Sequence, residues 1–191
     1  WEAAMSKGRD RVLAGDYSKY DARMPAQATI AAFDILIDIA RQCDGYSEDD
    51  IHLMEMLVHE VVYPVMANNG DLIQLFGTNP SGQNLTVIIN SLVNSLLLRS
   101  CFYSIYPEKD FKECCSFLTY GDDVIGTVSA DCPRYTHITY AQWLAEHDMK
   151  FTMPDKKSTP VHYMKECDVD FLKRKSVFNP DLGCKVGLLS E

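Results

Sequence analysis

Residues 117–126 read FLTYGDDVIG, so that two adjacent carboxylates, Asp122 and Asp123, are flanked on both sides by apolar residues. Gly-Asp is typical of a tight turn, and the stretch therefore predicts a strand, a turn and a second strand. Two like charges at a hairpin tip repel each other unless a cation offsets them. Mg²⁺ binds carboxylate oxygens and keeps positions open for substrate phosphates. A solvated Asp-rich turn would have the same sequence, so this motif alone leaves both interpretations open.

A third carboxylate follows a second strand-like run. Residues 11–15 (RVLAG) are short and apolar enough for a buried strand, and Asp16 comes directly after them. If the two strands are neighbours, Asp16, Asp122 and Asp123 converge at one edge of a sheet. Three such carboxylates are the ligand set of a two-metal phosphoryl-transfer site, in which the ions lie roughly 3.5–4 Å apart.

The rest of the chain alternates helical and hairpin patterns. Pro25 stands where a first helical turn would begin, and Ser47 followed by three acids is typical of a helix N-terminus. The expected elements are a helix over 26–41, a helix over about 48–60, a hairpin with strands 61–66 and 72–76, a helix over about 85–104, the hairpin 117–128, a helix over 135–147 and a hairpin over 171–178. This order predicts an α+β fold with helices packed on one face of a small antiparallel sheet.

Composition limits the functional classes. The 191 residues are 47% hydrophobic, enough for one sizeable core, and no stretch approaches the roughly 20 apolar residues of a membrane span. Seven cysteines without a CxxC pair favour small buried thiols in a reducing, intracellular setting. The net charge of −9 opposes nucleic-acid binding. However, basic residues gather in the last fifth of the chain, at Lys156, Lys157, Lys165, Lys173, Arg174 and Lys175.

Five segments, in order, resemble the conserved motifs of RNA-dependent RNA polymerases from positive-strand RNA viruses. They are Asp16-Tyr17-Ser18-Lys19-Tyr20-Asp21 for motif A, Ser81-Gly82-Gln83-Asn84-Leu85-Thr86-Val87-Ile88-Ile89-Asn90 for motif B, Tyr120-Gly121-Asp122-Asp123 for motif C, Pro154-Asp155-Lys156-Lys157 for motif D, and Phe171-Leu172-Lys173-Arg174 for motif E in its picornavirus-like form. The ordered set is far more specific than any one motif. It implies a polymerase palm over 1–191 with part of the fingers at about 42–80. The upstream fingers and the C-terminal thumb would lie outside this chain, which begins with Trp1 and is expected to be part of a longer protein.

The resemblance implies two-metal nucleotidyl transfer from ribonucleoside triphosphates to an RNA 3′ hydroxyl, directed by an RNA template. Asp16 and Asp122 would be the principal ligands of two Mg²⁺ ions, for which Mn²⁺ could substitute. Asp123 would lie nearby, and Tyr17 would offer its backbone carbonyl. Lys156 would protonate the leaving pyrophosphate as a general acid. The adjacent Lys157 leaves that assignment open.

The resemblance also implies contacts with sugar and RNA. Asp21 and Asn90 would read the ribose 2′-hydroxyl, and Thr86 lies four residues before Asn90 on the same helical face. A site built to bond a hydroxyl rejects a substrate that lacks it. The loop residues Ser81 and Gly82 would contact the template–nucleotide pair, and Lys173 and Arg174 the primer backbone. Plainer alternatives remain open. Asn90 could be a locally bonded helix amide, Ser81 and Gly82 a helix-capping turn, and Lys173 and Arg174 a charged hairpin edge.

The implied partners are an RNA template, a primer or product strand, ribonucleoside triphosphates and other viral replication proteins, without direct membrane insertion. The implied setting is the host cell cytoplasm, in membrane-associated replication complexes. A reverse transcriptase-like polymerase is an alternative, but such enzymes exclude the 2′-hydroxyl with a bulky residue where this chain has Asp21. A non-catalytic binding module could also retain the palm fold. A metal-dependent phosphatase or nuclease would explain neither motif B nor FLKR.

Overall fold

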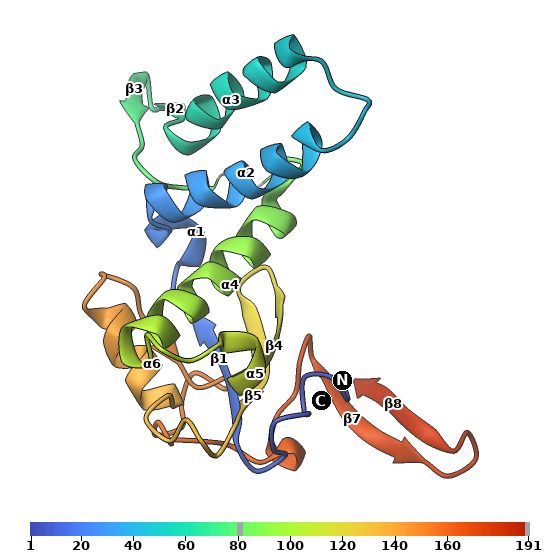
Figure 1. Cartoon of the computed structure of the whole chain (residues 1–191). Coiled ribbons are helices and arrows are strands. Elements are labelled where there is room, and N and C mark those ends of the chain that lie inside the picture. The colour runs from blue at the N-terminus through green and yellow to red at the C-terminus, as the bar shows by residue number, and fades with distance from the viewer. Residues whose placement is uncertain (80–81, 190–191) are drawn as a thin grey trace. The chain divides into compact units, whose positions relative to one another are not determined.

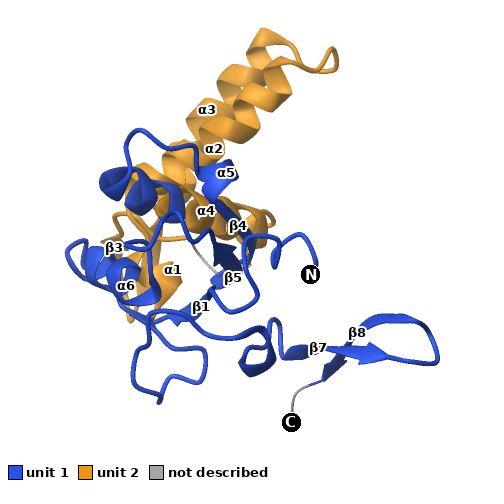
Figure 2. Cartoon of the chain, turned by 60° about the horizontal axis from the view of Figure 1, so that its bottom comes forward, with its two compact units in different colours: residues 1–18, 98–191 blue, residues 19–97 orange. Residues whose placement is uncertain are grey.

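The computed structural model describes residues 1–79 and 82–189 (Figure 1). The chain divides into two compact units (Figure 2). The first comprises Trp1–Ser18 and Leu98–Glu191, and the second is Lys19–Leu97. The carboxylates of the expected metal site therefore belong to the first unit, and the expected ribose-binding residues belong to the second.

The first unit is built on a four-stranded sheet in the order β4-β5-β1-β6. Its strands are β4 (Cys115–Tyr120), β5 (Asp123–Val128), β1 (Val12–Tyr17) and β6 (Phe151–Thr152), and every neighbouring pair is antiparallel. The two apolar runs identified in the sequence are therefore neighbouring strands, which is the condition for their carboxylates to meet at one edge. The edge strand β6 was not predicted, because two residues are too few to carry a periodic signal.

Helices cover one face of this sheet. Helix α6 (His137–Ala145) packs against β1 and β6, and the short α5 (Phe111–Cys114) packs against β4. Aromatic rings fill this layer. Phe102 of helix α4 (Thr86–Ile105) contacts Tyr135, and Phe151 contacts both Tyr17 and Tyr140. The predicted α+β fold is confirmed.

The opposite face of the sheet carries a second apolar cluster. It is formed by Ala4, Met5, Val12, Ala14, Ile125, Met153, Met164 and Val169, with Trp1 and Phe171 packed against it. Thr127 fixes the N-terminal segment to this face, since its hydroxyl donates to the carbonyl oxygen of Ala4 at 2.6 Å. The sheet is therefore buried on both faces, and its strand-end carboxylates lie at the margin of a packed core.

The second unit contains α1 (Tyr20–Arg23), α2 (Ala26–Arg41), α3 (Glu48–Val62) and a hairpin of β2 (Val65–Asn68) and β3 (Asp71–Gln74). Helix α3 starts with a reciprocal capping box between Ser47 and Asp50. The prediction of a strand from residue 61 was wrong, because α3 continues to Val62. Ile51, Val58 and Val62 are buried at helical spacing, so packing extends the helix beyond the predicted end.

The C-terminal hairpin also differs from its prediction. Phe171 and Arg174 form a single antiparallel bridge around Leu172 and Lys173, whose φ angles are 54° and 56°. The main hairpin pairs β7 (Arg174–Asn179) with β8 (Cys184–Leu189). The predicted hairpin over 171–178 was therefore too short, because the chain makes a tight turn before the first long strand begins.

Helix α4 is long and apolar enough to cross a membrane by length and composition, so the expectation that no stretch approaches that length was wrong. The same helix has buried residues along its length, at Ile89, Val93, Leu97, Leu98, Cys101 and Phe102. A core helix meets the same criterion, so this is weak evidence for a span. All seven cysteines are free thiols, and four of them are buried, at positions 101, 114, 115 and 132.

Candidate active site

Strands β1 and β5 bring Asp16 and Asp123 together. Their register pairs Val12 with Thr127 and Gly15 with Val124, so one further step places Asp16 opposite Asp123. Directly opposed residues of antiparallel strands project from the same face. Both carboxylates line one cavity of about 300 Å³.

A lysine from the loop after β6 closes this cavity. The ammonium group of Lys156 forms an ion pair with Asp16, and Lys156 also lines the cavity. The Asp155 carboxylate accepts hydrogen bonds from the N–H groups of Lys157 and Ser158 at 3.1 and 3.0 Å. This turn holds Lys156 in the left-handed backbone region, with φ of 60°. Lys157 does not line the cavity.

Negative charge is concentrated around Asp123. Burial raises the pKa of its carboxyl, and the neighbouring charges of Asp122, Asp16 and Asp170 raise it further. Lys156 partly opposes this effect. Four carboxylates thus lie within electrostatic reach of one another, where a cation would relieve the repulsion.

The carboxylates do not form a closed ligand cluster. Within residues 1–79 and 82–189, no three His, Cys, Asp or Glu side chains are grouped so that they could hold a metal ion. Asp122 lies in the two-residue turn between β4 and β5, and it does not line the cavity that Asp16 and Asp123 share. Adjacent residues along an extended strand project in opposite directions. The carboxylate oxygens of Asp16, Asp122 and Asp123 are ligands that Mg²⁺ prefers. Only Asp16 and Asp123 line the same cavity, so the three side chains do not all converge there.

Tyr17 is a buried packing residue on the other face of β1. Its hydroxyl lies 2.5 Å from the hydroxyl of Tyr140, and its ring contacts Phe151 edge-on. Burial raises the pKa of Tyr17 well above its ordinary value. Any contribution of Tyr17 to a metal site would therefore come from its backbone.

The expected ribose-binding residues occupy the second unit. Asp21 is exposed on α1, whereas the side chain of Asn90 on α4 is only 9% exposed. The Thr86 hydroxyl donates to the carbonyl oxygen of Gln83 at 2.6 Å, so it is engaged at the start of α4. Gly82 has φ of 96°, a conformation that favours glycine. Ser81 lies outside the described residues.

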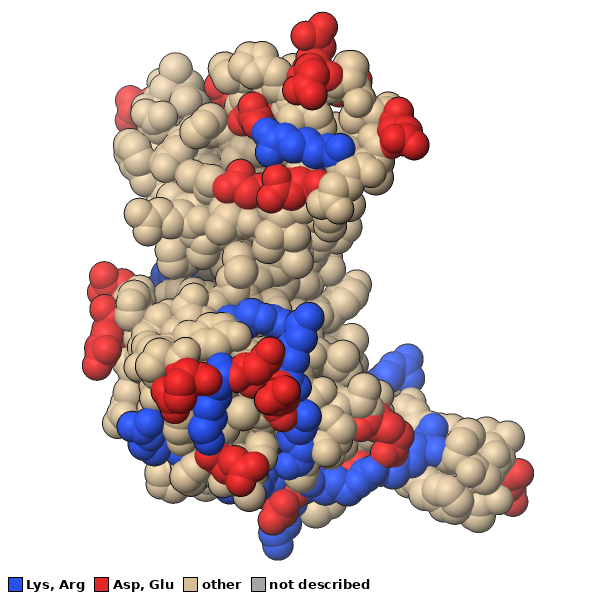
Figure 3. All heavy atoms as spheres, viewed as in Figure 1, with Lys and Arg blue, Asp and Glu red and all other residues tan. Residues whose placement is uncertain are grey.

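The two residues expected to bind the primer differ in their surroundings. Lys173 lines the cavity of Asp16 and Asp123. The guanidinium of Arg174 donates to the carbonyl oxygen of Gly187 at 3.0 Å and so braces the β7–β8 hairpin. Lys and Arg side chains are interspersed with Asp and Glu side chains on the face shown in Figure 3.

A family model described as "Viral RNA-dependent RNA polymerase" matches residues 2–182. The chain belongs to the viral RNA-dependent RNA polymerase family. All five motifs lie within the residues that the family model matches.

The relatives of this polymerase-family chain are viral polyproteins. It is 25% identical over 181 residues to the genome polyprotein of Deformed wing virus, covering 92% of this chain and 6% of that protein. It is 28% identical over 190 residues to the replicase polyprotein of Drosophila C virus, covering 90% of this chain and 10% of that protein. It is 31% identical over 178 residues to the genome polyprotein of Ljunganvirus 1, covering 92% of this chain and 7% of that protein. The chain thus spans a tenth or less of these polyproteins.

The fold is also that of a solved polymerase. The structure titled Sicinivirus 3Dpol RNA dependent RNA polymerase matches 95% of this chain with a TM-score of 0.70 and 22% sequence identity. The match covers 37% of that polymerase. At this identity the likeness establishes the fold alone.

Two polar residues near the motifs were not predicted from the sequence to belong to a functional site. Asp170 lines the cavity beside Asp16 and Asp123 and directly precedes FLKR. Asn79 is completely buried and precedes the Pro-Ser-Gly turn. Each is a single polar residue next to a motif. Their position next to a motif was the one feature of the sequence that could have indicated a role. Position in the sequence does not predict the direction in which a side chain points.

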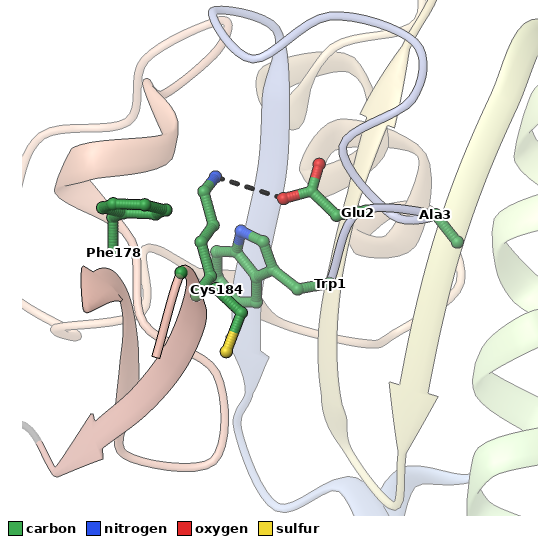
Figure 4. Close-up of a pocket in the computed structure, with 7 residues that line it drawn as sticks. Trp1, Glu2, Ala3, Phe178 and Cys184 are labelled. Carbon is green, nitrogen blue, oxygen red and sulfur yellow. Dashed lines mark ion pairs between the residues drawn. The ribbon is translucent and has the colours of Figure 1, made fainter. Parts of the chain in front are cut away.

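A larger cavity, of about 740 Å³, lies elsewhere in the first unit (Figure 4). Trp1, Glu2 and Ala3 line it together with Phe178 and Lys185. The ammonium of Lys185 pairs with Glu2 at 3.3 Å, the dashed contact in Figure 4. None of the candidate site residues lines this cavity, so it does not extend the candidate site. The ion pair between Lys185 and Glu2 joins the N-terminal segment to the β7–β8 hairpin.

Proposed function

We propose that this chain is the catalytic segment of a polymerase that synthesises RNA on an RNA template. The observation that carries the proposal is the single cavity that Asp16 and Asp123 share at the ends of the paired strands β1 and β5, with Lys156 paired to Asp16 in that cavity. Membership of the polymerase family supports it. A template, a primer or product strand and ribonucleoside triphosphates are the proposed partners. Other viral replication proteins and the host cell cytoplasm are the proposed context.

Asp16, Asp122 and Asp123 are the proposed Mg²⁺ ligands, with the Tyr17 carbonyl as a further oxygen donor. Two bound Mg²⁺ ions, or Mn²⁺ in their place, would lower the pKa of the attacking hydroxyl and stabilise the leaving pyrophosphate. The residues themselves supply the negative charge that holds the cations. Burial and the charges of Asp122, Asp16 and Asp170 raise the pKa of Asp123, which supports a site where a cation would relieve repulsion.

Lys156 is the proposed general acid, in preference to Lys157. Lys156 lines the cavity and contacts Asp16, whereas Lys157 does neither. Its hydrogen bond to Asp16 raises the pKa of Lys156, so the ammonium is protonated at neutral pH. This pairing also holds the proton more tightly, so Lys156 would have to leave Asp16 to act as a general acid. A proton delivered to the pyrophosphate oxygen offsets the charge that develops as the bond to phosphorus breaks.

Sugar and RNA contacts complete the proposal. Asp21 and Asn90 are proposed to bond the ribose 2′-hydroxyl, which distinguishes this chain from a reverse transcriptase-like polymerase. Thr86, on the same helical face as Asn90, is assigned to the same nucleotide pocket. The remaining assignments are the template–nucleotide contacts of Ser81 and Gly82 and the primer contacts of Lys173 and Arg174. A palm at 1–191 with part of the fingers at about 42–80 remains the proposed domain assignment.

A specific observation favours a second candidate, a non-catalytic module that retains the palm fold. Asp16 is neutralised by Lys156, and the described carboxylates do not form a three-ligand group. A module of this kind would use the acidic edge to bind a protein or a cation without turnover.

Primer extension distinguishes the two candidates. The longest polymerase chain that contains these 191 residues is incubated with an RNA template–primer, Mg²⁺ and ribonucleotides, beside its Asp122→Asn and Asp16→Asn variants. We expect extension by the wild type and a loss of more than about a thousandfold in both variants, which keep the shape of the side chain and remove its charge. A folded wild-type protein that binds the template–primer without extending it would establish the binding module instead.

A further inference from the structure

A buried asparagine outside the expected site connects the two ribose-recognition residues within the second unit. The side chain of Asn79 is 0% exposed. Its Nδ2 atom lies 2.6 Å from Asn90 Oδ1 and 3.4 Å from the carbonyl oxygen of Thr86. Its backbone N–H donates to the carbonyl oxygen of Asp21 at 3.4 Å. One residue therefore contacts the segments that carry both Asp21 and Asn90.

The hydrogen-bond pattern determines which way the Asn90 amide is turned. The carbonyl oxygen of Thr86 can only accept, so the Asn79 atom that faces it is the NH₂ group. The same NH₂ group faces Asn90, and the Asn90 atom that meets it is therefore the acceptor Oδ1. The NH₂ group of Asn90 is left to donate elsewhere. A ribose 2′-hydroxyl can accept such a bond, and a deoxyribose has no oxygen there.

This arrangement leaves one polar atom of Asn79 without a partner among the residues that the structure describes. Its Oδ1 is buried and has no hydrogen-bond partner within the described part of the chain. A buried acceptor without a partner destabilises a fold, and each such group calls for a reason. A second buried contact supports the same geometry: the hydroxyl of Tyr20, the residue before Asp21, donates to the carbonyl oxygen of Asn90 at 2.9 Å.

We infer that Asn79 is a positioning residue for sugar selection. It holds the Asn90 amide with its oxygen turned inward, so that the NH₂ group is available to the 2′-hydroxyl. It also ties the backbone of Asp21 to the same point. Without Asn79 the Asn90 amide would rotate freely, and the bond to the hydroxyl would be lost for part of the time. This inference rests on the proposed polymerase function.

The test is the ratio of kcat/KM for a ribonucleoside triphosphate to that for its 2′-deoxy counterpart, in single-nucleotide incorporation. Asn79→Asp retains the shape but replaces the donor with an acceptor, so Asn90 must turn its NH₂ group inward. We expect the ratio to fall about five- to tenfold, the effect of one hydrogen bond, through a higher KM for the ribonucleotide. Asn68→Asp is the matched control, because Asn68 is exposed on β2. Its ratio should equal that of the wild type.

The outcomes distinguish a failure of this inference from a failure of the proposed polymerase function. A purely structural role for Asn79 would lower incorporation of both nucleotides in parallel, and the unchanged ratio would overturn the inference. A wild-type chain that incorporates neither nucleotide would instead refute the proposed function. If Asn79→Asp loses its thermal unfolding transition, Asn79→Ser repeats the test without a buried charge. Loss of folding in both variants would reassign Asn79 to the fold and overturn its role in selection.

Discussion

The ammonium group of Lys156 is paired with the carboxylate of Asp16. The two side chains differ in exposure: that of Lys156 is 67% exposed and that of Asp16 is 16% exposed. An ion pair with so exposed a partner contributes little to stability and is readily exchanged. This exposure fits the proposed role of Lys156, in which the ammonium would leave Asp16 when a cation binds and would then contact a phosphate.

Replacing Lys156 with methionine should separate its two roles. Without the ammonium, Asp16 is no longer neutralised, so Mn²⁺ should bind the nucleotide-free protein several-fold more tightly. Single-turnover nucleotide incorporation should fall about a hundredfold, because the general acid is lost. Mn²⁺ binding is measured by electron paramagnetic resonance and incorporation by rapid quench.

Lys157→Met is the matched control for this variant, since Lys157 is adjacent and does not line the cavity. It should leave both quantities within about twofold of the wild type. An equal loss of incorporation in the two variants would contradict the assignment of Lys156 as the general acid.

Asp123→Asn should stabilise the fold while it removes activity. Burial and the charges of Asp122, Asp16 and Asp170 raise the pKa of Asp123, so the folded state disfavours the ionised carboxylate. Solvent screens part of this repulsion because the carboxyl is only half-buried, so a neutral amide should raise the free energy of unfolding by at most about 1 kcal/mol and Tm by about 2–3 °C. Calorimetry at pH 7 in the absence of divalent cations measures this. A lower Tm would show that the carboxylate stabilises the turn instead.

Glu166 should govern stability at acidic pH. Burial alone would raise the pKa of Glu166, but hydrogen bonds from Lys185, Arg9 and Trp1 outweigh it and lower the pKa from 4.5 to about 2. Because the folded-state pKa is depressed, the stabilisation is present above about pH 4.5 and is lost as the pH falls towards 2. The difference in urea unfolding between wild type and Glu166→Gln should therefore be largest at pH 7 and shrink below pH 4.

The control for Glu166 is Glu108→Gln, an exposed glutamate with no ion pair among the residues described. Its substitution should not change the pH dependence. If Glu166→Gln follows the wild-type curve over the whole range, the ion-pair network does not stabilise the native state.

Gly15 is required for the contact between β1 and β6. A Cβ atom there would lie 2.3 Å from Phe151 Cζ and 2.7 Å from the carbonyl oxygen of Thr152. Gly15→Ala should therefore destabilise the fold by about 1–3 kcal/mol through overpacking. Chemical denaturation measures the change. Gly45→Ala should be neutral or slightly stabilising, since nothing lies within 4 Å of a Cβ at that exposed position.

Elements whose signals are local could be predicted from the amino-acid sequence. Helix α2 starts after Pro25 and runs over the predicted residues, and the capping pattern at Ser47 places the start of α3. The Gly-Asp turn and its flanking apolar residues determine the β4–β5 hairpin. Caps, turns and periodicity depend on residues a few positions apart, which is why they can be read without the fold.

Which side chains meet depends on the folded chain and could not be predicted from local signals. Strand register brings Asp123, and not Asp122, to the cavity of Asp16, and a left-handed turn directs Lys156 there instead of Lys157. The buried amide of Asn79 reaches Asn90 across a loop that carries no periodic signal. A side chain's direction follows from register and backbone angles set by long-range packing. Adjacent residues with the same chemistry are therefore indistinguishable until the chain has folded.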